Sequence, residues 1–368
     1  MHDLYPSIRR PARRLGLLLG GVLGGLLGAG QAADALTITP SYDASWSDAG
    51  WGSAATNAAA KNVVNNVIAE FQGFFSNPVS ITIAFGLGEV RGLPVTSGAA
   101  AFFDASDFPP TTQFTLAQVK ALYATAAGAA GATQVLVTAN ANLPAAYPNP
   151  GGSNMFMVPD AEYKALTGGL ALDADPIDGY TGYATNGNFC SSGPACPYDF
   201  TGGAPAAGTI DFTAVVEHEL SHAMSRVDFA FSGNDMNPGG PPPFLTPQDF
   251  FRYQDNAGTC NTTLEPRFNI ACFSYDGGAT NPSPFRTFSN SSDSGDWINA
   301  NSDSFNAFLG RGVDGSISIT DILLMCAEGW NDRAVCGTPA TSAPEPGTLA
   351  LLGTSLLGLA ALRRRRRE

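Results

Sequence analysis

Histidine is scarce in this sequence, with three copies among 368 residues. His2 falls in an N-terminal segment that has the features of a removable leader, so the mature chain would keep only His218 and His222. This scarcity excludes a metal centre built from three histidines. A centre with two histidines and one oxygen ligand is still compatible with the sequence.

Basic residues are few in the part of the chain that would bind a polyanion. Of the 19 lysines and arginines, nine lie in the first 32 or the last 25 residues, together with three of the 32 acidic residues. The body between these ends has 10 basic and 29 acidic residues, a net charge of −19. Such a surface repels a phosphate backbone, and we therefore expect no nucleic-acid partner.

Long apolar runs are also missing, because none reaches the about 20 residues that a membrane-spanning helix needs. Near the N-terminus, four arginines precede an apolar, glycine-rich run, Leu15–Ala29, and small residues at 30–32 then offer a cleavage site. This order is typical of a secretory signal, so we interpret residues 1–32 as a signal peptide. A membrane anchor is the alternative, and the paired arginines also permit twin-arginine export.

The C-terminal segment has the features of a second targeting signal. Pro-Glu-Pro at 344–346 is followed by an apolar run at 347–362 and by five arginines, Arg363–Arg367. This tail, residues 344–368 after a linker at 338–343, resembles the PEP-CTERM sorting signal of Gram-negative bacteria. The resemblance implies export to the cell envelope or extracellular matrix, cleavage by an exosortase, and transient membrane contact through the terminal signals. The arginines should stay cytoplasmic, and an ordinary C-terminal anchor is the alternative.

Six cysteines, an even number in a chain with an export signal, indicate disulfides. Cys-x-x-Cys spacing is absent, which argues against a cysteine zinc site. Six cysteines permit 15 pairings. Because they cluster in neighbouring pairs, we predict three local bridges: Cys190–Cys196, Cys260–Cys272 and Cys326–Cys336.

The segment Val215–Asp228 holds both remaining histidines in an H-E-x-x-H motif formed by His218, Glu219 and His222. We predict a helix over about 212–225, because this run contains no glycine or proline and follows possible capping residues. Spacing of four residues sets both imidazoles on one face, where they can bind one zinc ion at about 2.0–2.1 Å per nitrogen. Glu219 lies one step round the helix, where its carboxylate can act as general base toward water. A helix with solvated histidines is the alternative.

The third protein ligand cannot be a histidine, so we expect a carboxylate or a less usual oxygen donor. Asp228 is the first candidate, because the spacing from His218 through Ser225 to Asp228 resembles the metzincin pattern with aspartate in the last place. Ser225 departs from that pattern, which has a glycine where the chain turns. Asp249 is the alternative ligand. It also follows Thr246 at capping-box spacing, so it can instead serve as a helix cap.

The body of the chain predicts an α+β fold. Its first half contains runs with the alternation of strands and runs with helical spacing: strands at 36–39 and 79–85, helices at 57–75 and after Thr115. We place an N-terminal lobe of mixed sheet and helices at 33–228, with the motif helix at its end. A loop-rich, mainly helical C-terminal lobe follows at 229–337.

Several further blocks accompany the motif in the order HELSHAMSR, TPQDFFRY, FSYDGG, SGDW and DILLMCAEGW. Over residues 36–330 the chain thereby resembles the NF038122-type family of bacterial metalloproteases, many of whose members end in PEP-CTERM tails. The resemblance implies a secreted, zincin-like protein with His218, Glu219 and His222 at its metal centre. It implies no particular substrate.

We therefore expect an exported zinc metalloendopeptidase, a hydrolase that cleaves protein or peptide substrates with Glu219 as general base. A non-catalytic envelope or matrix protein with a structural or vestigial metal site is the alternative. Arg226 can pair with an acid beside the site or hold a substrate carbonyl. Calcium is a second candidate cofactor, because four aspartates lie in Gly-, Ser- and Asn-rich loops and can supply oxygen ligands: Asp276, Asp293, Asp296 and Asp303. These aspartates do not have the spacing of an EF-hand.

Overall fold

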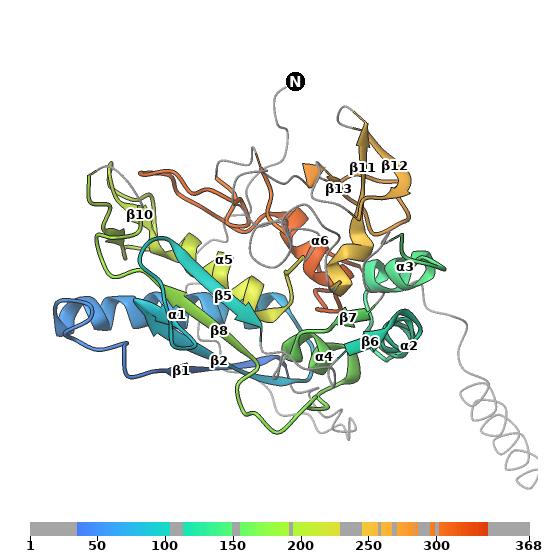
Figure 1. The fold of residues 1–368 in the computed structure, drawn as a ribbon, viewed down its shortest axis with the longest axis horizontal. Coiled ribbons are helices and arrows are strands. Elements are labelled where there is room, and N and C mark those ends of the chain that lie inside the picture. Colours follow the sequence, from blue (N-terminus) through green and yellow to red (C-terminus); the bar gives the residue numbers. More distant parts are fainter. Residues whose placement is uncertain are drawn as a thin grey trace, which may run out of the picture. The chain divides into compact units, whose positions relative to one another are not determined.

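The computed structural model contains two compact units, each drawn from three stretches of the chain. Figure 1 labels the helices and strands. The first unit takes its described residues from Met1–Asp104, Pro176–Ala223 and Trp297–Asp321, and the second from Ala105–Asp175, Met224–Asp296 and Ile322–Glu368. The structure describes residues 35–103, 113–148, 155–190, 194–228, 245–256, 259–266, 271–282, 284–285, 295–298 and 302–337. The predicted signal peptide, linker and sorting tail lie outside these residues. The units interleave along the chain, whereas the predicted lobes follow one another.

A four-stranded sheet organises the first unit, in the order β1-β2-β8-β5. Three of its strands are parallel and the edge strand β5 is antiparallel to β8: β1 (Thr37–Tyr42), β2 (Ser80–Leu87), β8 (Gly179–Tyr183) and β5 (Ala99–Phe103). In β2, the buried residues Ile81, Ile83 and Phe85 alternate with less buried neighbours, the pattern that predicted this strand. The predicted strands at 36–39 and 79–85 are thus confirmed.

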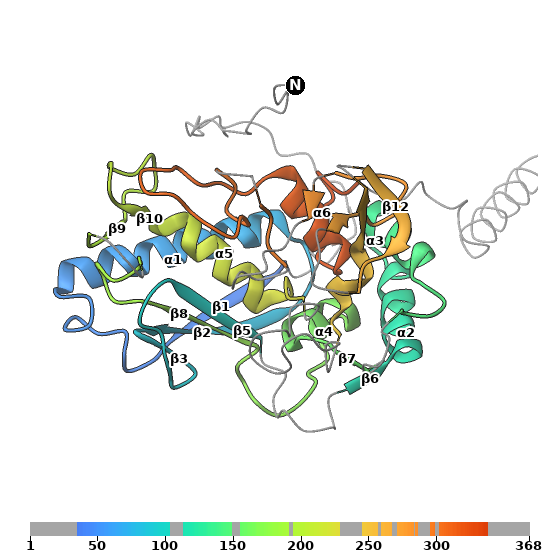
Figure 2. The ribbon, with the colours of Figure 1, turned by 45° about the horizontal axis from the view of Figure 1, so that its top comes forward.

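Two long helices lie next to one another on one side of this sheet (Figure 2). α1 (Ala54–Phe74) corresponds to the helix predicted at 57–75, and α5 (Phe212–Met224) contains the H-E-x-x-H motif. Gly179 of β8 allows α5 to approach the sheet, since a Cβ there would lie 2.5 Å from the carbonyl oxygen of Ala223. The sheet and α1 therefore support the motif helix.

A cluster of aromatic rings attaches the start of α5 to the sheet. The ring centroid of Tyr183 in β8 lies 5.2 Å from that of Phe212, the first residue of α5, and Trp51 lies 5.5 Å from the same ring. Trp46 meets Tyr183 edge-on at 5.8 Å. All four rings are buried, and each such side chain removes about 150–250 Å² from water. This packing fixes where α5 begins.

Short strand pairs complete the first unit: β3 (Glu89–Val90) with β4 (Leu93–Pro94), and β9 (Tyr198–Asp199) with β10 (Ile210–Asp211). The last described helix, α6 (Ile319–Ala327), is divided between the units, because its residues from Ile322 onward belong to the second unit. Among the described residues, none of the helices combines the length and the apolar character that crossing a membrane requires.

The second unit combines short helices with two small sheets. Its remaining helices are α2 (Leu116–Ala127), α3 (Gln134–Asn142), α4 (Asp160–Thr167) and the 3-10 helix η2 (Pro247–Phe251). One sheet pairs β6 (Gln113–Thr115) with β7 (Met155–Met157), and the other has the order β12-β11-β13-β14. The capping box predicted before α2 is confirmed, because the Thr115 side chain accepts the N–H of Gln118 and the Gln118 side chain accepts that of Thr115.

The described residues of the C-terminal half are less helical than predicted. The α+β class is confirmed, but the expectation of a mainly helical lobe at 229–337 is wrong for the part of that range that the structure describes. The described residues there include an antiparallel sheet: β11 (Arg252–Asn256), β12 (Thr259–Leu264), β13 (Ala271–Phe273) and β14 (Pro284–Phe285). The last two strands have three and two residues, too few for an alternating pattern to be recognised in the sequence.

The three predicted disulfides are confirmed. The Cα atoms of the pairs lie 5.9, 5.6 and 6.5 Å apart: Cys190–Cys196, Cys260–Cys272 and Cys326–Cys336. The second bridge joins β12 to β13, strands that the sequence did not predict. These bridges fit an oxidising compartment outside the cytoplasm.

Candidate metal centre

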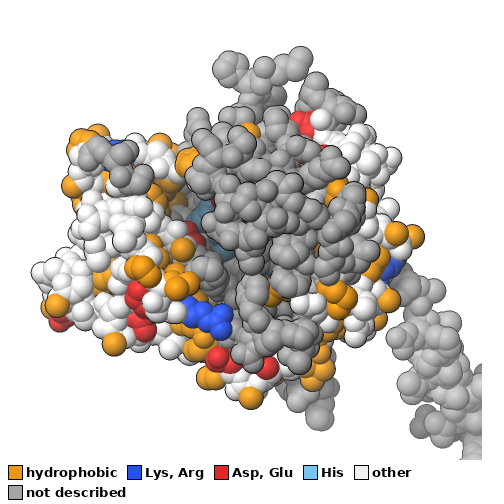
Figure 3. Space-filling view, viewed as in Figure 1, with side chains coloured by type: hydrophobic (Ala, Val, Ile, Leu, Met, Phe, Trp, Pro, Cys, Tyr) orange, Lys and Arg blue, Asp and Glu red, His pale blue; other side chains and the backbone are white. Residues whose placement is uncertain are grey.

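The motif helix α5 has one face against the core and another that carries the imidazoles. Val216 and Leu220 are fully buried. Asp211, just before the helix, accepts the backbone N–H of Thr213 at 2.9 Å and so caps the helix start. His222 is buried and His218 is half-buried, and the histidine atoms coloured pale blue in Figure 3 are visible on the face drawn there. The local sequence thus turns two rings away from the apolar stripe.

The two imidazoles are arranged as a pair of metal ligands. Nε2 of His218 lies 3.0 Å from Nε2 of His222, and their ring centroids are 4.6 Å apart. Two nitrogens that bind one tetrahedral zinc ion at about 2.0–2.1 Å stand about 3.4 Å apart. The observed separation differs from this by a few tenths of an ångström, which small side-chain rotations supply. The pair therefore fits a shared zinc ion.

A backbone carbonyl determines which nitrogen of His218 carries the proton. Nδ1 of His218 lies 2.8 Å from the carbonyl oxygen of Ser304. A carbonyl oxygen only accepts, so Nδ1 is the donor and Nε2 of the neutral ring keeps its lone pair. That lone pair is on the nitrogen that faces His222. Metal-binding histidines commonly use their second ring nitrogen in this way.

Glu217, the residue before His218, is held by the same serine. The Ser304 hydroxyl donates a hydrogen bond to Oε2 of Glu217. Burial raises the pKa of Glu217, and the neighbouring carboxyl of Glu70, to which it is hydrogen-bonded, raises it further. Glu70 belongs to α1. A carboxyl pair thus links α1 to α5 directly beside the motif.

Glu219, the predicted general base, lies on the same helix and is largely buried. Its negative charge reaches two aromatic hydroxyls of the unit. Burial is the main cause of the raised pKa of Tyr198, and Glu219 adds to it. Burial likewise dominates the raised pKa of Tyr183, to which Glu219 also contributes. Glu219 is therefore close enough to both hydroxyls for its charge to act on them.

The structure places Asp228 and Asp249 together, in the second unit. Asp228 forms an ion pair with Arg252, and both side chains are fully buried. Asp249 accepts the backbone N–H of Thr246 at 2.6 Å in the capping box of η2. Burial raises the pKa of Asp249, and the adjacent charge of Asp228, to which it is also hydrogen-bonded, raises it further. Within this unit, both candidate ligands take part in a structural cluster around Arg252.

Arg226 pairs with an acid, one of the two roles predicted for it. Its guanidinium binds Asp296 and donates to the carbonyl oxygen of Gly295 at 3.2 Å, all within the second unit. Both members of the ion pair are nearly inaccessible to solvent. Asp296, predicted as a calcium-loop residue, thus has a buried partner.

Two of the other predicted calcium ligands accept hydrogen bonds from residues of their own loops. Asp276 accepts the hydroxyl of Ser274 at 2.7 Å and the N–H of Thr280 at 2.8 Å. Asp303 accepts the N–H of Phe305 at 2.8 Å. Asp293 lies outside the described residues. Calcium binding therefore remains a prediction from composition alone.

The sequence did not predict the residues that form hydrogen bonds with His218 and Glu217 of the motif helix. Ser304 and Glu70 lie far from the motif in the chain, 86 residues after His218 and 147 before Glu217. No spacing rule connects such distant positions. The composition around Ser304, rich in serine and asparagine, predicts a loop and nothing more specific.

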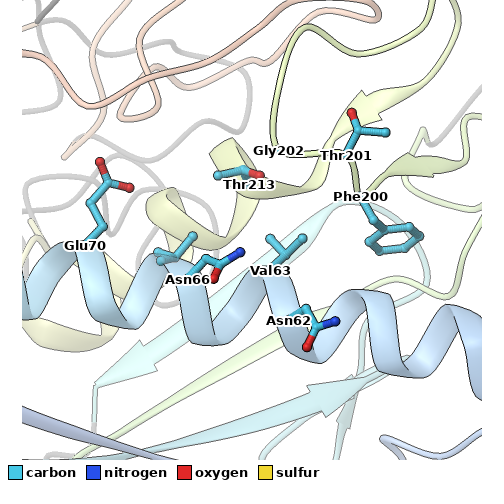
Figure 4. A pocket seen from close by; sticks show the side chains of 9 residues that line it. Asn62, Val63, Asn66, Glu70, Phe200, Thr201, Gly202 and Thr213 are labelled. Carbon is cyan, nitrogen blue, oxygen red and sulfur yellow. The ribbon is translucent and has the colours of Figure 1, made fainter. Parts of the chain in front are cut away.

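A surface hollow adjoins the start of α5 (Figure 4). It measures about 240 Å³, and Glu70 stands at one end while Phe200 stands at the other. Its lining is a mixture of amide, hydroxyl, carboxyl and apolar groups: Asn62, Val63, Asn66, Val67, Glu70, Phe200, Thr201, Gly202 and Thr213. The two histidines are not part of this lining, so the hollow and the imidazole pair are separate features of the unit.

Comparison with known proteins identifies the C-terminal tail. Residues 342–366 match the PEP-CTERM protein-sorting motif. No curated protein and no solved structure matches the chain. The tail indicates an exported protein of the cell envelope of a Gram-negative bacterium, processed by sorting machinery of the exosortase type. The predicted sorting signal is thereby confirmed. The match does not extend to the rest of the chain, so the function of that part is argued from its structure.

Proposed function

We propose that this chain is an exported, zinc-dependent endopeptidase. The observation that carries the proposal is the pair of Nε2 atoms 3.0 Å apart on α5, one of them on a ring oriented by the carbonyl of Ser304. Glu219 lies next to His218 in the same helix. Two imidazoles and a carboxylate in this order suit hydrolysis at a zinc ion.

The surrounding fold supports the same proposal. A mixed sheet with one antiparallel edge strand carries α1 and α5 on one side, and we propose that this arrangement is zincin-like. The motif helix α5 is packed tightly at both ends, since aromatic rings contact its first residue and Gly179 lies close to its last turn. Catalytic groups on a rigid helix keep the separation that they need for reaction.

Glu219 performs the proton transfers of the proposed reaction. Zinc, when bound, supplies Lewis acidity that polarises the peptide carbonyl and acidifies water. Glu219 accepts the proton of the attacking water as the new carbon–oxygen bond forms. It then donates that proton to the amide nitrogen as the carbon–nitrogen bond breaks, which releases a carboxylic acid and an amine; the acid then gives its remaining proton to solvent.

The third protein ligand stays a prediction. Within the second unit, the first candidate, Asp228, pairs with Arg252, and the alternative, Asp249, is hydrogen-bonded to Asp228. These contacts give both carboxylates a structural role, so the proposal rests on the two imidazoles and Glu219.

Removal of the metal tests the proposed function. We expect a strong chelator to abolish cleavage of casein or gelatin by the export-processed protein, and one equivalent of zinc to restore it, because the two imidazoles alone cannot polarise a carbonyl. Cleavage is measured by release of soluble peptides, with the chelator removed before zinc is added. Cleavage that persists after complete removal of metal contradicts a zinc peptidase, and a chain that binds zinc without cleaving either substrate supports a structural site.

A further inference from the structure

Ser304 makes two different contacts with two adjacent residues of the motif helix. Its carbonyl oxygen accepts from Nδ1 of His218 at 2.8 Å, and its hydroxyl donates to Glu217. Ser304 itself is 3% exposed. The carbonyl contact sets the direction of the imidazole, and the hydroxyl contact holds the carbonyl in place against α5. Backbone and side chain of one residue thus act on the same turn of the helix.

The segment around Ser304 is anchored independently of those contacts. The N–H of Ser304 donates to the carbonyl of Ser316, and the N–H of Ser316 donates to that of Ser302, both at 3.0 Å. Gly315 packs so tightly on α5 that a Cβ there would lie 2.4 Å from the Cβ of Ala214. Its N–H donates to Asp211, the residue that caps α5. The segment is therefore supported along the whole of the helix's first turns.

We propose that Ser304 is a positioning residue for the metal centre, an inference that rests on the proposed function. The Ser304 carbonyl selects the tautomer of His218 with the proton on Nδ1, which leaves Nε2 as the ligand atom. The Ser304 hydroxyl, through Glu217, keeps that carbonyl at the distance that the ring requires. Without the hydroxyl bond the carbonyl shifts, and the ring samples orientations in which Nε2 points away from His222.

The carboxyl pair behind the serine strengthens this arrangement. Glu217 is hydrogen-bonded to Glu70 of α1 as well as to Ser304. Ser304 is thereby tied to two helices, and His218 is tied to Ser304. A ring held through such a chain of buried bonds loses little further freedom when it binds a metal, which raises the affinity of the site.

Zinc affinity of matched serine variants tests the proposal. Ser304→Ala keeps the backbone carbonyl and removes only the hydroxyl, and we expect it to weaken zinc binding by about 10–100-fold. Ser304→Thr restores a hydroxyl and is expected to recover most of the parent's affinity. Ser302→Ala makes the same chemical change at an exposed serine two residues away and is expected to bind zinc as the parent does. Affinity is measured by competition with a chromophoric chelator, and circular dichroism verifies that each variant is folded.

A spectroscopic measurement on the unmodified chain decides the tautomer. In the zinc-loaded protein labelled with nitrogen-15, we expect His218 to show a protected proton on Nδ1 and zinc on Nε2. Zinc bound through Nδ1 overturns the proposal, even if Ser304→Ala does not fold. An equal zinc affinity of folded Ser304→Ala and the parent also overturns it. Both of these failures leave the proposed function intact, whereas a parent chain that binds no zinc removes that function and this inference together.

Discussion

Replacing Glu219 with glutamine is expected to lower the rate of peptide cleavage by about 10²–10⁴-fold while zinc stays bound. The glutamine side chain has nearly the shape of glutamate, but it cannot accept a proton from water or return one to the leaving amine. The histidines are unchanged, so the metal content of Glu219→Gln should equal that of the parent. The measurement is kcat/KM for a casein-derived peptide, paired with the zinc content of the same preparation.

Glu162→Gln provides a matched control for this experiment. Glu162 is fully buried in the second unit, where burial and then the charge of Glu328 raise its pKa, and it accepts a hydrogen bond from Tyr123 at 3.2 Å. Burial favours the uncharged form of this carboxyl, and glutamine is an uncharged side chain of nearly the same shape. We expect Glu162→Gln to cleave peptides at the parent's rate. A Glu219→Gln protein that cleaves as well as this control refutes the role of Glu219.

Replacing Asp228 with alanine is expected to destabilise the fold by about 3–5 kcal/mol, because it leaves the guanidinium of Arg252 buried without its partner. Both side chains of this pair are fully buried, so water cannot solvate the remaining charge. The zinc site is expected to persist in the fraction that stays folded. Denaturant unfolding of the zinc-loaded protein measures the first effect, and metal analysis of the folded fraction at low temperature measures the second.

Asp296→Asn is the companion variant for the other buried ion pair of the second unit. An asparagine still accepts a hydrogen bond from Arg226, but it lacks the negative charge of aspartate. We expect this variant to lower the unfolding free energy by less than Asp228→Ala does. Loss of zinc from folded Asp228→Ala assigns the third ligand position to Asp228.

The sequence predicted well what depends on local spacing. The H-E-x-x-H motif lies on a helix because its residues between 212 and 224 favour one, and four-residue spacing then brings the two imidazoles together. The capping box at Thr115 and the three short disulfide loops are local in the same sense. Each of these features depends on residues at most 12 positions apart, so the local sequence was sufficient to predict it.

Features that join distant segments were not predictable from spacing. The sequence of β8, Gly-Tyr-Thr-Gly-Tyr, shows no clear alternation of apolar and polar residues. The strand nevertheless pairs with β2 and β5, whose paired residues lie 76 or more positions away in the chain. Asp228 fitted a known ligand pattern, but its buried partner Arg252 lies 24 positions later. Ser304 reaches His218 from 86 positions away. Tertiary packing decides such contacts, and no local rule indicates them.

The most direct test of this account is the metal content of the export-processed protein. After purification without added metal, or after incubation with zinc and removal of the excess, elemental analysis is expected to find about one zinc ion per chain. Loss of both imidazoles, in His218→Ala with His222→Ala, should abolish that binding. A parent protein that contains no zinc, and takes up none when zinc is supplied, contradicts the metal centre on which the proposed chemistry depends.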